Sequence, residues 1–193
     1  MQLPEQRYYS PEEYLEFEVN SEEKHEYIDG QVILQVSEIT NHNTVVGNFG
    51  ANLLMALKRQ PYQVFILRQR LWIPQKRMYV YPDVMAIADQ LEYAEGRRDT
   101  LINPVLIAEV LSKSTKSYDR DEKFAAYRTI PNFQEYILID QYKIHVEQYY
   151  KTDNNKWIFS EYEDANLLLN LSSIPCQVLL GDIYDQVDFS VEA

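Results

Sequence analysis

An unbroken apolar run at residues 105–111, VLIAEVL, encloses a single carboxylate at Glu109. A run of this length and composition is typical of a buried strand. A second carboxylate, Asp83, follows a proline at the end of the aromatic segment MYVYPDV, 26 residues earlier. Burying an ionised carboxylate is costly unless a positive charge compensates it. Two carboxylates on neighbouring apolar segments therefore indicate a shared cation.

The segment 105–140 contains a strand, a helix and a second strand. The helix is expected to begin near Asp119, with Glu122 in the capping-box position, and to end before Pro131. The apolar segment 133–140, FQEYILID, then predicts a strand. A right-handed crossover to a parallel neighbouring strand explains this order best.

Capping signals, turn residues and hydrophobic periodicity predict the remaining elements. Ser10 as N-cap, Pro11 and Glu13 mark the start of a helix, and Asp-Gly at 29–30 predicts a β-hairpin within 25–37. We expect further helices at 21–26 and 43–59, and strands at 62–69, 69–74, 79–88, 143–151 and 156–162. The C-terminal segment 174–187 is left unassigned. This order indicates an α/β (α+β) chain with a central mixed β-sheet flanked by helices, N-terminal helices and a β-hairpin.

Length and composition predict one domain over residues 1–193, because 46% of the residues are hydrophobic and the chain is short for two cores. No apolar run approaches the roughly 18 to 20 residues that span a bilayer, and the N-terminus lacks the regions of a signal peptide. We expect a soluble, cytoplasmic protein with no membrane partner. A single cysteine, Cys176, cannot form an internal disulfide, which fits a reducing compartment.

The net charge of −12 argues against a large nonspecific nucleic-acid surface, since phosphate binding depends on clustered cations. Six cations nevertheless fall close together in the middle of the chain: Lys58, Arg59, Arg68, Arg70, Lys76 and Arg77. A solvated basic face is the more ordinary explanation of such a run. The acidic total weakens a DNA-binding interpretation without excluding it.

Adjacent strands would bring Asp83 and Glu109 within reach of one hard divalent cation. Oxygen ligands with retained waters favour Mg²⁺ or Mn²⁺ over zinc. The three histidines, His25, His42 and His145, are widely spaced and form no zinc motif. The alternative is structural: either carboxylate can cap the next element or pair with an arginine.

Lys123 follows the Glu109 strand on the predicted helix, with Tyr127 one turn later on the same side. A lysine near these carboxylates could orient a nucleophile or stabilise negative charge on a phosphate. An ordinary i,i+4 pair with Asp119 is the alternative. Lys113 is a second candidate for the role, although it would project beyond the strand end.

Five motifs in order, EYIDG, YPDV, IAEVLSKST, YDRDEKFAAYR and EYILID, resemble those of the Uma-type family of restriction endonucleases. This family was formerly a domain of unknown function, is abundant in cyanobacteria and belongs to the PD-(D/E)XK nuclease superfamily. The resemblance extends from about residue 14 to residue 150. It implies a restriction-endonuclease-like core with a divalent-metal site at one end.

The resemblance also implies roles for individual residues. Asp83 corresponds to the aspartate of the PD motif, Glu109 to the second metal-binding acid, and Glu26 to an additional N-terminal acid at the metal. The superfamily pattern has a lysine two residues after the second acid, where this chain has Leu111. The catalytic lysine would then be Lys123, displaced onto the following helix.

The implied activity is Mg²⁺-dependent or Mn²⁺-dependent hydrolysis of DNA phosphodiester bonds, with Asp83, Glu109 and Lys123 as catalytic residues and Asp83, Glu109 and Glu26 as metal ligands. Two other interpretations remain. The chain could be a noncatalytic scaffold with a nuclease-like fold, or a metal-dependent phosphoesterase acting on another nucleic acid or a nucleotide. A homodimer is expected, because symmetric cutting of two strands suits paired subunits.

Overall fold

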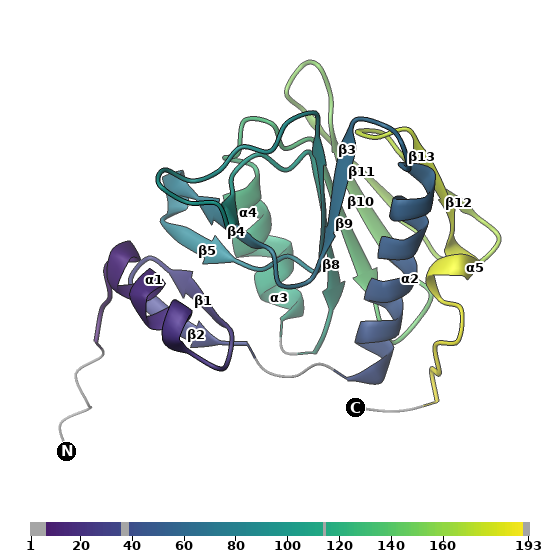
Figure 1. The fold of residues 1–193 in the computed structure, drawn as a ribbon. Coiled ribbons are helices and arrows are strands. Elements are labelled where there is room, and N and C mark those ends of the chain that lie inside the picture. Colours follow the sequence, from purple (N-terminus) through teal and green to yellow (C-terminus); the bar gives the residue numbers. More distant parts are fainter. Residues whose placement is uncertain (1–6, 36–38, 114, 191–193) are drawn as a thin grey trace.

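The computed structural model describes residues 7–35, 39–113 and 115–190, in which mixed sheets are flanked by helices (Figure 1). The helices are α1 (Pro11–Asn20), α2 (Thr40–Ala56), η1 (Pro74–Lys76), α3 (Lys116–Tyr118), η2 (Asp119–Lys123), α4 (Phe124–Tyr127) and α5 (Leu180–Ile183). The strands are β1 (His25–Ile28), β2 (Gln31–Leu34), β3 (Tyr62–Ile66), β4 (Arg70–Ile73), β5 (Met78–Val80), β6 (Val84–Ala88), β7 (Thr100–Leu101), β8 (Leu106–Leu111), β9 (Glu135–Asp140), β10 (Val146–Lys151), β11 (Trp157–Tyr162), β12 (Leu168–Leu171) and β13 (Cys176–Leu179). The fold class predicted from the sequence is confirmed.

The largest sheet has six strands in the order β11-β10-β9-β8-β6-β3. Strand β8 pairs parallel to β9, with Glu109 opposite Leu138, and antiparallel to β6. The parallel neighbour expected for the strand, helix, strand unit is therefore present. The hairpin expected at 143–162 is also confirmed, since β10 and β11 pair antiparallel.

Helices cover both faces of this sheet, as Figure 1 shows. Alternate residues of β6 divide between two apolar cores: Val84 and Ala86 pack in the α2 cluster, whereas Met85 and Ile87 pack in the cluster that contains Tyr127. This alternation follows from the two-residue period of a strand. Buried on both faces, the central strands β6 and β8 read as continuous apolar runs in the sequence.

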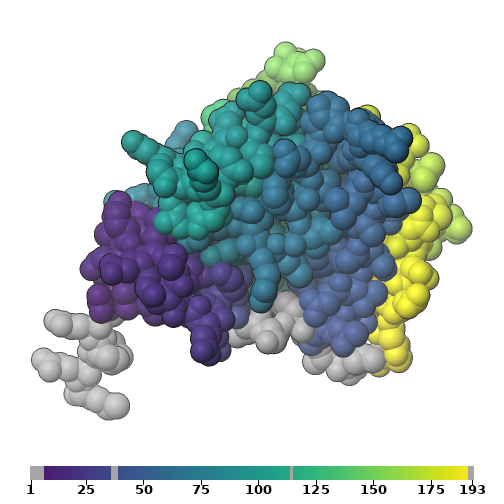
Figure 2. Space-filling view, viewed as in Figure 1, coloured from purple at the N-terminus to yellow at the C-terminus, as the bar shows by residue number. Residues whose placement is uncertain are grey.

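The N-terminal segment belongs to a five-stranded sheet in the order β2-β1-β5-β4-β7, and forms one side of the molecule (Figure 2). The predicted capping box is present, because the Glu13 amide donates to Ser10 Oγ at 3.1 Å and the Ser10 amide donates to the Glu13 carboxylate at 2.7 Å. The predicted hairpin turn is also present, with φ of 40° at Asp29 and 99° at Gly30. Positive φ at both positions is the signature of a type I′ turn.

The predicted single strand at 79–88 is wrong, and two further sheets accompany the central mixed sheet. Strand β5 belongs to the five-stranded sheet and β6 to the six-stranded sheet, and a two-stranded sheet, β12-β13, is separate. Residues 81–83 form the link between the two larger sheets. Asp83 therefore lies at a junction just before β6, rather than within a strand.

Two predicted helix starts are also wrong. Residues 21–24 form no helix, and β1 begins at His25, because this segment pairs with β2 and β5. N-terminal helices were expected, but in the described N-terminal segment α1 is followed directly by β1. Asp119 is not an N-cap: the helix begins at Lys116, and Asp119 has helical backbone angles inside it.

The ends of the remaining elements differ by a few residues from the prediction. Helix α2 spans Thr40–Ala56, three residues earlier than the expected 43–59. The unassigned C-terminal segment forms β13 and α5, which lie beside α2 (Figure 1). None of the helices in the described part of the chain has the length and apolar character needed to cross a membrane.

Candidate metal-binding active site

Asp83 and Glu109 lie side by side, because β6 and β8 are neighbouring strands and Val84 pairs with Ala108. The Asp83 amide donates to Glu109 Oε2 at 3.3 Å, and the Val110 amide donates to Asp83 Oδ2 at 2.8 Å. Glu109 is buried, and the Asp83 side chain is 14% exposed. The strand adjacency expected from the sequence thus brings the two carboxylates together.

Lys123 lies among the carboxylates. Its Nζ is 3.2 Å from Glu109 Oε1, 3.2 Å from Asp119 Oδ1 and 3.7 Å from Glu26 Oε1. Lys123 makes the i,i+4 pair with Asp119 and also reaches Glu109 on β8. The π-helical turn η2 presents Asp119 and Lys123 to the same buried side.

Glu26 reaches the same place from β1. Its Oε1 accepts a hydrogen bond from the Tyr81 amide at 3.4 Å and from Gln35 Nε2 at 3.5 Å. The Glu26 side chain is buried. The acid expected at the N-terminal hairpin is therefore placed beside Lys123.

Lys113 lies outside the pocket of the carboxylates. It is exposed, does not line their pocket, and its Nζ lies 5.4 Å from the centre of the Tyr142 ring. Four positions beyond Glu109, its side chain projects past the end of β8, as its place in the sequence suggested. Lys123 is the lysine that contacts Glu109 and Glu26.

Two further side chains hold the acids in place. His42, in the first turn of α2, is buried with its Nε2 3.3 Å from Asp83 Oδ2. Tyr127 donates a hydrogen bond from its hydroxyl to Glu109 Oε1 at 2.6 Å. The four-residue spacing of 119, 123 and 127 signals the tyrosine in the sequence, but no local pattern connects His42 with Asp83.

The electrostatics of the cluster are dominated by burial. Burial raises the pKa of Glu109 to about 8, although Lys123 opposes the shift and Asp83 adds to it. Burial acts to lower the pKa of the Lys123 ammonium, but Glu109, Glu26 and Asp119 together raise it well above its usual value. The lysine therefore stays charged, and the neighbouring carboxylates compete for its one positive charge.

The charge count favours a further cation. Lys123 contacts the carboxyl groups of Glu26, Glu109 and Asp119, and Asp83 lies beside Glu109, so four shielded carboxyl groups share one ammonium. Carboxylate oxygens are the donors that Mg²⁺ and Mn²⁺ prefer. The residues present thus fit a divalent metal in both charge and ligand type, with Asp83, Glu109 and Glu26 as the available ligands.

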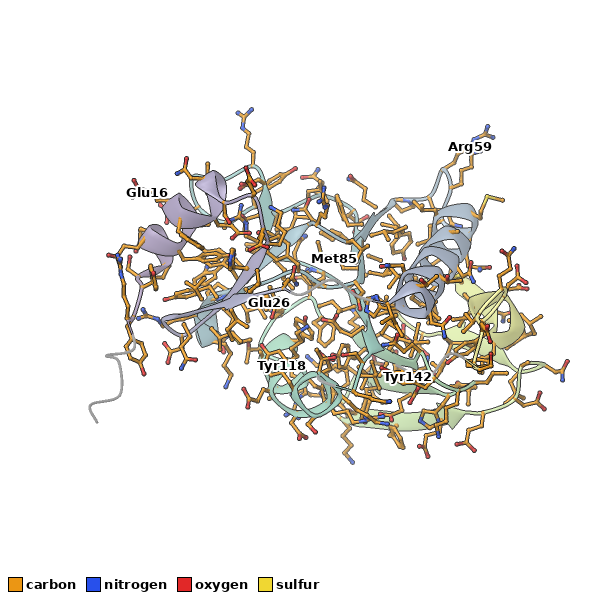
Figure 3. The ribbon with its side chains drawn as sticks, turned by 90° about the horizontal axis from the view of Figure 1, so that it is seen from below. Glu16, Glu26, Arg59, Met85, Tyr118 and Tyr142 are labelled. Carbon is orange, nitrogen blue, oxygen red and sulfur yellow. The ribbon has the colours of Figure 1, made fainter. Side chains whose placement is uncertain are left out.

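These side chains line a pocket of about 760 Å³. Its walls come from the β1–β2 hairpin, the start of α2, the turn after β3 and the helix 116–127. In Figure 3, Glu26 and Tyr118 lie in the central part of the molecule, whereas Arg59 lies at the far end of α2. The Tyr118 ring centre is 5.5 Å from Lys123 Nζ, which adds a cation–π contact to the ammonium.

A second acidic cluster lies outside this pocket. Within the described ranges, the only histidine and carboxylate trio whose ligand atoms fall within 4.8 Å of one another is His145, Glu147 and Glu161. Arg120 already pairs with Glu147, its Nε lying 3.1 Å from Glu147 Oε1. In the pocket, by contrast, Lys123 lies between Glu26 and Glu109, so the three predicted ligands do not form such a compact trio.

Comparisons with known proteins agree with the motifs and the fold. A solved structure described as “a putative nuclease belonging to DUF820”, from Anabaena variabilis, superposes with a TM-score of 0.75 and 17% identity over 92% of this chain and 98% of that chain. Two uncharacterized proteins of Synechocystis are similar in sequence. The protein sll1609 is 39% identical over 83% of this chain and 90% of its own length, and slr1290 is 31% identical over 93% of each. The model of the Uma2 family, described as “Putative restriction endonuclease”, matches residues 11–180, and the chain belongs to this family.

Proposed function

We propose that this protein is a divalent-metal-dependent endonuclease that hydrolyses DNA phosphodiester bonds, with Mg²⁺ or Mn²⁺ as cofactor. The observation that carries the proposal is the group of Asp83, Glu109 and Lys123 at one pocket, with Lys123 Nζ 3.2 Å from Glu109 Oε1. Membership of a family described as restriction endonucleases supports a nucleic-acid substrate. The superfamily pattern noted above supports the assignment of roles.

Asp83, Glu109 and Glu26 would hold the metal. A divalent cation supplies Lewis-acid polarisation of the phosphoryl group and makes a bound water a better nucleophile. The Val110 amide and His42 fix the orientation of the Asp83 carboxylate, and Tyr127 does the same for Glu109. Such supporting contacts keep ligands in a productive geometry without reorganisation during the reaction.

Lys123 would stabilise the negative charge that develops on the phosphoryl oxygens. Its ammonium stays protonated, because the surrounding carboxylates raise its pKa. The position that carries a lysine in the superfamily pattern is occupied by Leu111, which is buried in the apolar cluster of Tyr127. A lysine on the helix that covers β8 can therefore replace one on the strand itself.

A noncatalytic scaffold is the second candidate. Two features favour it. Lys123 is already paired with three carboxylates, and the net charge of −12 disfavours broad contact with DNA. Calorimetric titration with Mn²⁺ separates the two candidates, because a scaffold has no need of a metal site. Heat of binding in the wild type that is lost in Asp83→Asn supports the enzyme.

We also propose a single domain over 1–193, a cytoplasmic location and a homodimer. The dimer is proposed because two-fold symmetric pairs are the commonest oligomers of soluble proteins. Sedimentation at micromolar concentration tests it, and a monomer throughout that range would contradict it.

The substrate is tested with a panel of duplex DNA, single-stranded DNA, RNA and nucleotides, each incubated with Mg²⁺, Mn²⁺ or EDTA. Cleavage of internal DNA bonds that requires metal supports the proposal. Hydrolysis confined to RNA or nucleotides would assign a different phosphoesterase activity. Absence of hydrolysis from every sample that contains metal would favour the scaffold.

A further inference from the structure

The turn between β3 and β4 has an unusual backbone. Leu67 and Arg68 have φ of 53° and 60°, and both line the pocket of the acidic cluster. Two successive residues with side chains in the left-handed region are uncommon, and for a bulky residue such as leucine the conformation is strained. Strain of this kind persists where the surrounding structure enforces it, and it is frequent at sites that contact ligands.

The turn is fixed by hydrogen bonds to the active-site region. The Leu67 amide donates to the Asp83 carbonyl at 2.8 Å, directly at the predicted metal ligand. The Gln69 amide donates to the Leu67 carbonyl at 2.8 Å, and Gln69 Nε2 donates to the Asp99 carbonyl at 2.9 Å. The positions of Leu67 and Arg68 are therefore tied to the position of Asp83.

Apolar side chains face the pocket from two walls. Leu67 is 39% exposed on the turn, and Ile33 and Leu34 are 43% and 44% exposed on β2. Exposed apolar side chains that line a pocket are a feature of ligand-binding grooves. Bases offer apolar faces to such side chains only when they are not stacked within a duplex.

Arg68 is available for a phosphate. Of the cations that line the pocket, Lys123 contacts three carboxylates and Lys24 lies 3.8 Å from Glu18 Oε1. For Arg68, by contrast, no carboxylate of the described residues lies within 4.0 Å of the guanidinium. A guanidinium binds phosphate with two parallel hydrogen bonds.

The size of the pocket limits what can enter it. Its volume of about 760 Å³ is that of a small-molecule site, and the side chain of Glu109 within it is only 4% exposed. A flexible single strand can place one phosphodiester beside these carboxylates. The bases of a duplex, by contrast, stay stacked and paired and do not enter the pocket. The net charge of −12 also disfavours contact with both strands of a duplex.

We infer that the pocket binds an unpaired nucleic-acid strand, with Leu67 against a base and Arg68 on a phosphate next to the scissile one. This inference rests on the proposed nuclease function and specifies its substrate as single-stranded DNA or an unpaired end. Leu67 and Arg68 act as positioning residues, because neither is part of the metal cluster.

The test is fluorescence anisotropy with a labelled single-stranded oligonucleotide and the corresponding duplex, in Ca²⁺ at several salt concentrations, with gels of the same samples to monitor cleavage. We expect tighter binding of the single strand. Arg68→Ala should weaken it and lower the slope of log affinity against log salt by about 0.7, the share of one phosphate contact. Leu67→Gly should weaken binding without changing this slope, while its melting temperature stays equal or rises because glycine relieves the strain.

Arg59→Ala is the matched control, since Arg59 is also an exposed arginine with positive φ but lies at the far end of α2 (Figure 3). Equal binding by Arg68→Ala and Arg59→Ala would overturn the inference, and so would tighter binding of the duplex or no binding of either oligonucleotide. If the wild type cleaves DNA in Mg²⁺ while Arg68→Ala behaves as the control, the inference fails and the proposed function stands. If the single strand binds through Arg68 and Leu67 but is never cleaved in Mg²⁺, the inferred binding site stands and the proposed nuclease function is contradicted.

Discussion

Lys123 Nζ lies 3.2 Å from Glu109 Oε1, a contact that joins the π-helical turn η2 to the central strand β8. The two residues are 14 positions apart, and each is buried. The other oxygen of Glu109, Oε2, accepts a hydrogen bond from the Asp83 amide. One carboxylate therefore connects the helix to the neighbouring strand end, and its charge state should affect both stability and activity.

Lys123→Met should destabilise the fold by about 3 to 5 kcal/mol at neutral pH, because it leaves buried carboxylates without their ammonium. Lys116→Met on the same helix is the control: that side chain is 47% exposed and pairs with Asp140 at 3.5 Å, so water screens the contact and its loss should cost less. Urea unfolding in EDTA measures the free energy of unfolding of both variants. Equal losses for the two variants would show that Lys123 does not neutralise the cluster.

Glu109→Gln should make the stability of the metal-free protein less dependent on pH. Burial raises the pKa of Glu109 from 4.5 to about 8, so between these values the folded chain binds a proton that the unfolded chain has released. The wild type should lose stability as pH rises through this window, and glutamine should remove that part of the loss. Free energies of unfolding measured across the window in EDTA test this, and an unchanged pH slope would contradict it.

Tyr127→Phe should destabilise the protein by about 1.5 to 3 kcal/mol when Glu109 is ionised, since it removes a hydrogen bond to a charged group. The hydroxyl bond at 2.6 Å lowers the pKa of Glu109, so its loss should move the pH dependence to higher pH. Tyr93→Phe, at a 41% exposed tyrosine, is the control. A variant that follows the wild type at every pH would mean that this hydrogen bond does not stabilise the carboxylate.

His42→Ala should reduce metal affinity and cleavage by about 10- to 100-fold, the usual cost of removing a group that orients a metal ligand. Its Nε2 is 3.3 Å from Asp83 Oδ2, so the carboxylate loses a partner but keeps the Val110 amide. Met55→Ala on the same helix, at a 77% exposed side chain, should match the wild type. Mn²⁺ titration and cleavage rates measure both effects; wild-type metal affinity in His42→Ala would remove His42 from the site.

Local signals in the sequence predicted those elements that local interactions determine. The capping box at Ser10 and Glu13 and the Asp29–Gly30 turn both need only neighbouring residues, and both are present. The parallel pairing of β8 and β9 also followed from the sequence, because a helix between two apolar segments limits how they can connect.

Tertiary contacts explain the elements that were predicted wrongly. Residues 79–88 look like one aromatic strand, but the chain changes sheets at Pro82, a residue that cannot donate to a ladder. Asp119 resembles an N-cap by composition, yet its carboxylate pairs with Lys123 inside the helix. For residues 79–88, partners distant in sequence, which no short motif reveals, decide the structure. For Asp119, the earlier start of the helix at Lys116 decides it.

The residues of the site were likewise predicted only in part. Asp83 and Glu109 stood out because ionisable groups are rare in apolar segments, and the structure places them together. The approach of Lys123 was suggested by its helix, whereas His42 comes from α2, 41 residues before Asp83, with no pattern linking them. Contacts of this kind, between elements distant in sequence, can be identified only when the fold is known.

Metal-dependent hydrolysis at Asp83 is tested most directly by cleavage of labelled DNA, both duplex and single-stranded, in Mg²⁺ by the wild type, Asp83→Asn and Asp89→Asn. Asp89 is the matched control, because it follows the other end of β6 and is exposed. We predict cleavage that EDTA abolishes, that is lost in Asp83→Asn with an unchanged melting profile, and that is retained in Asp89→Asn. Equal cleavage by Asp83→Asn and the wild type would contradict the assignment of this site.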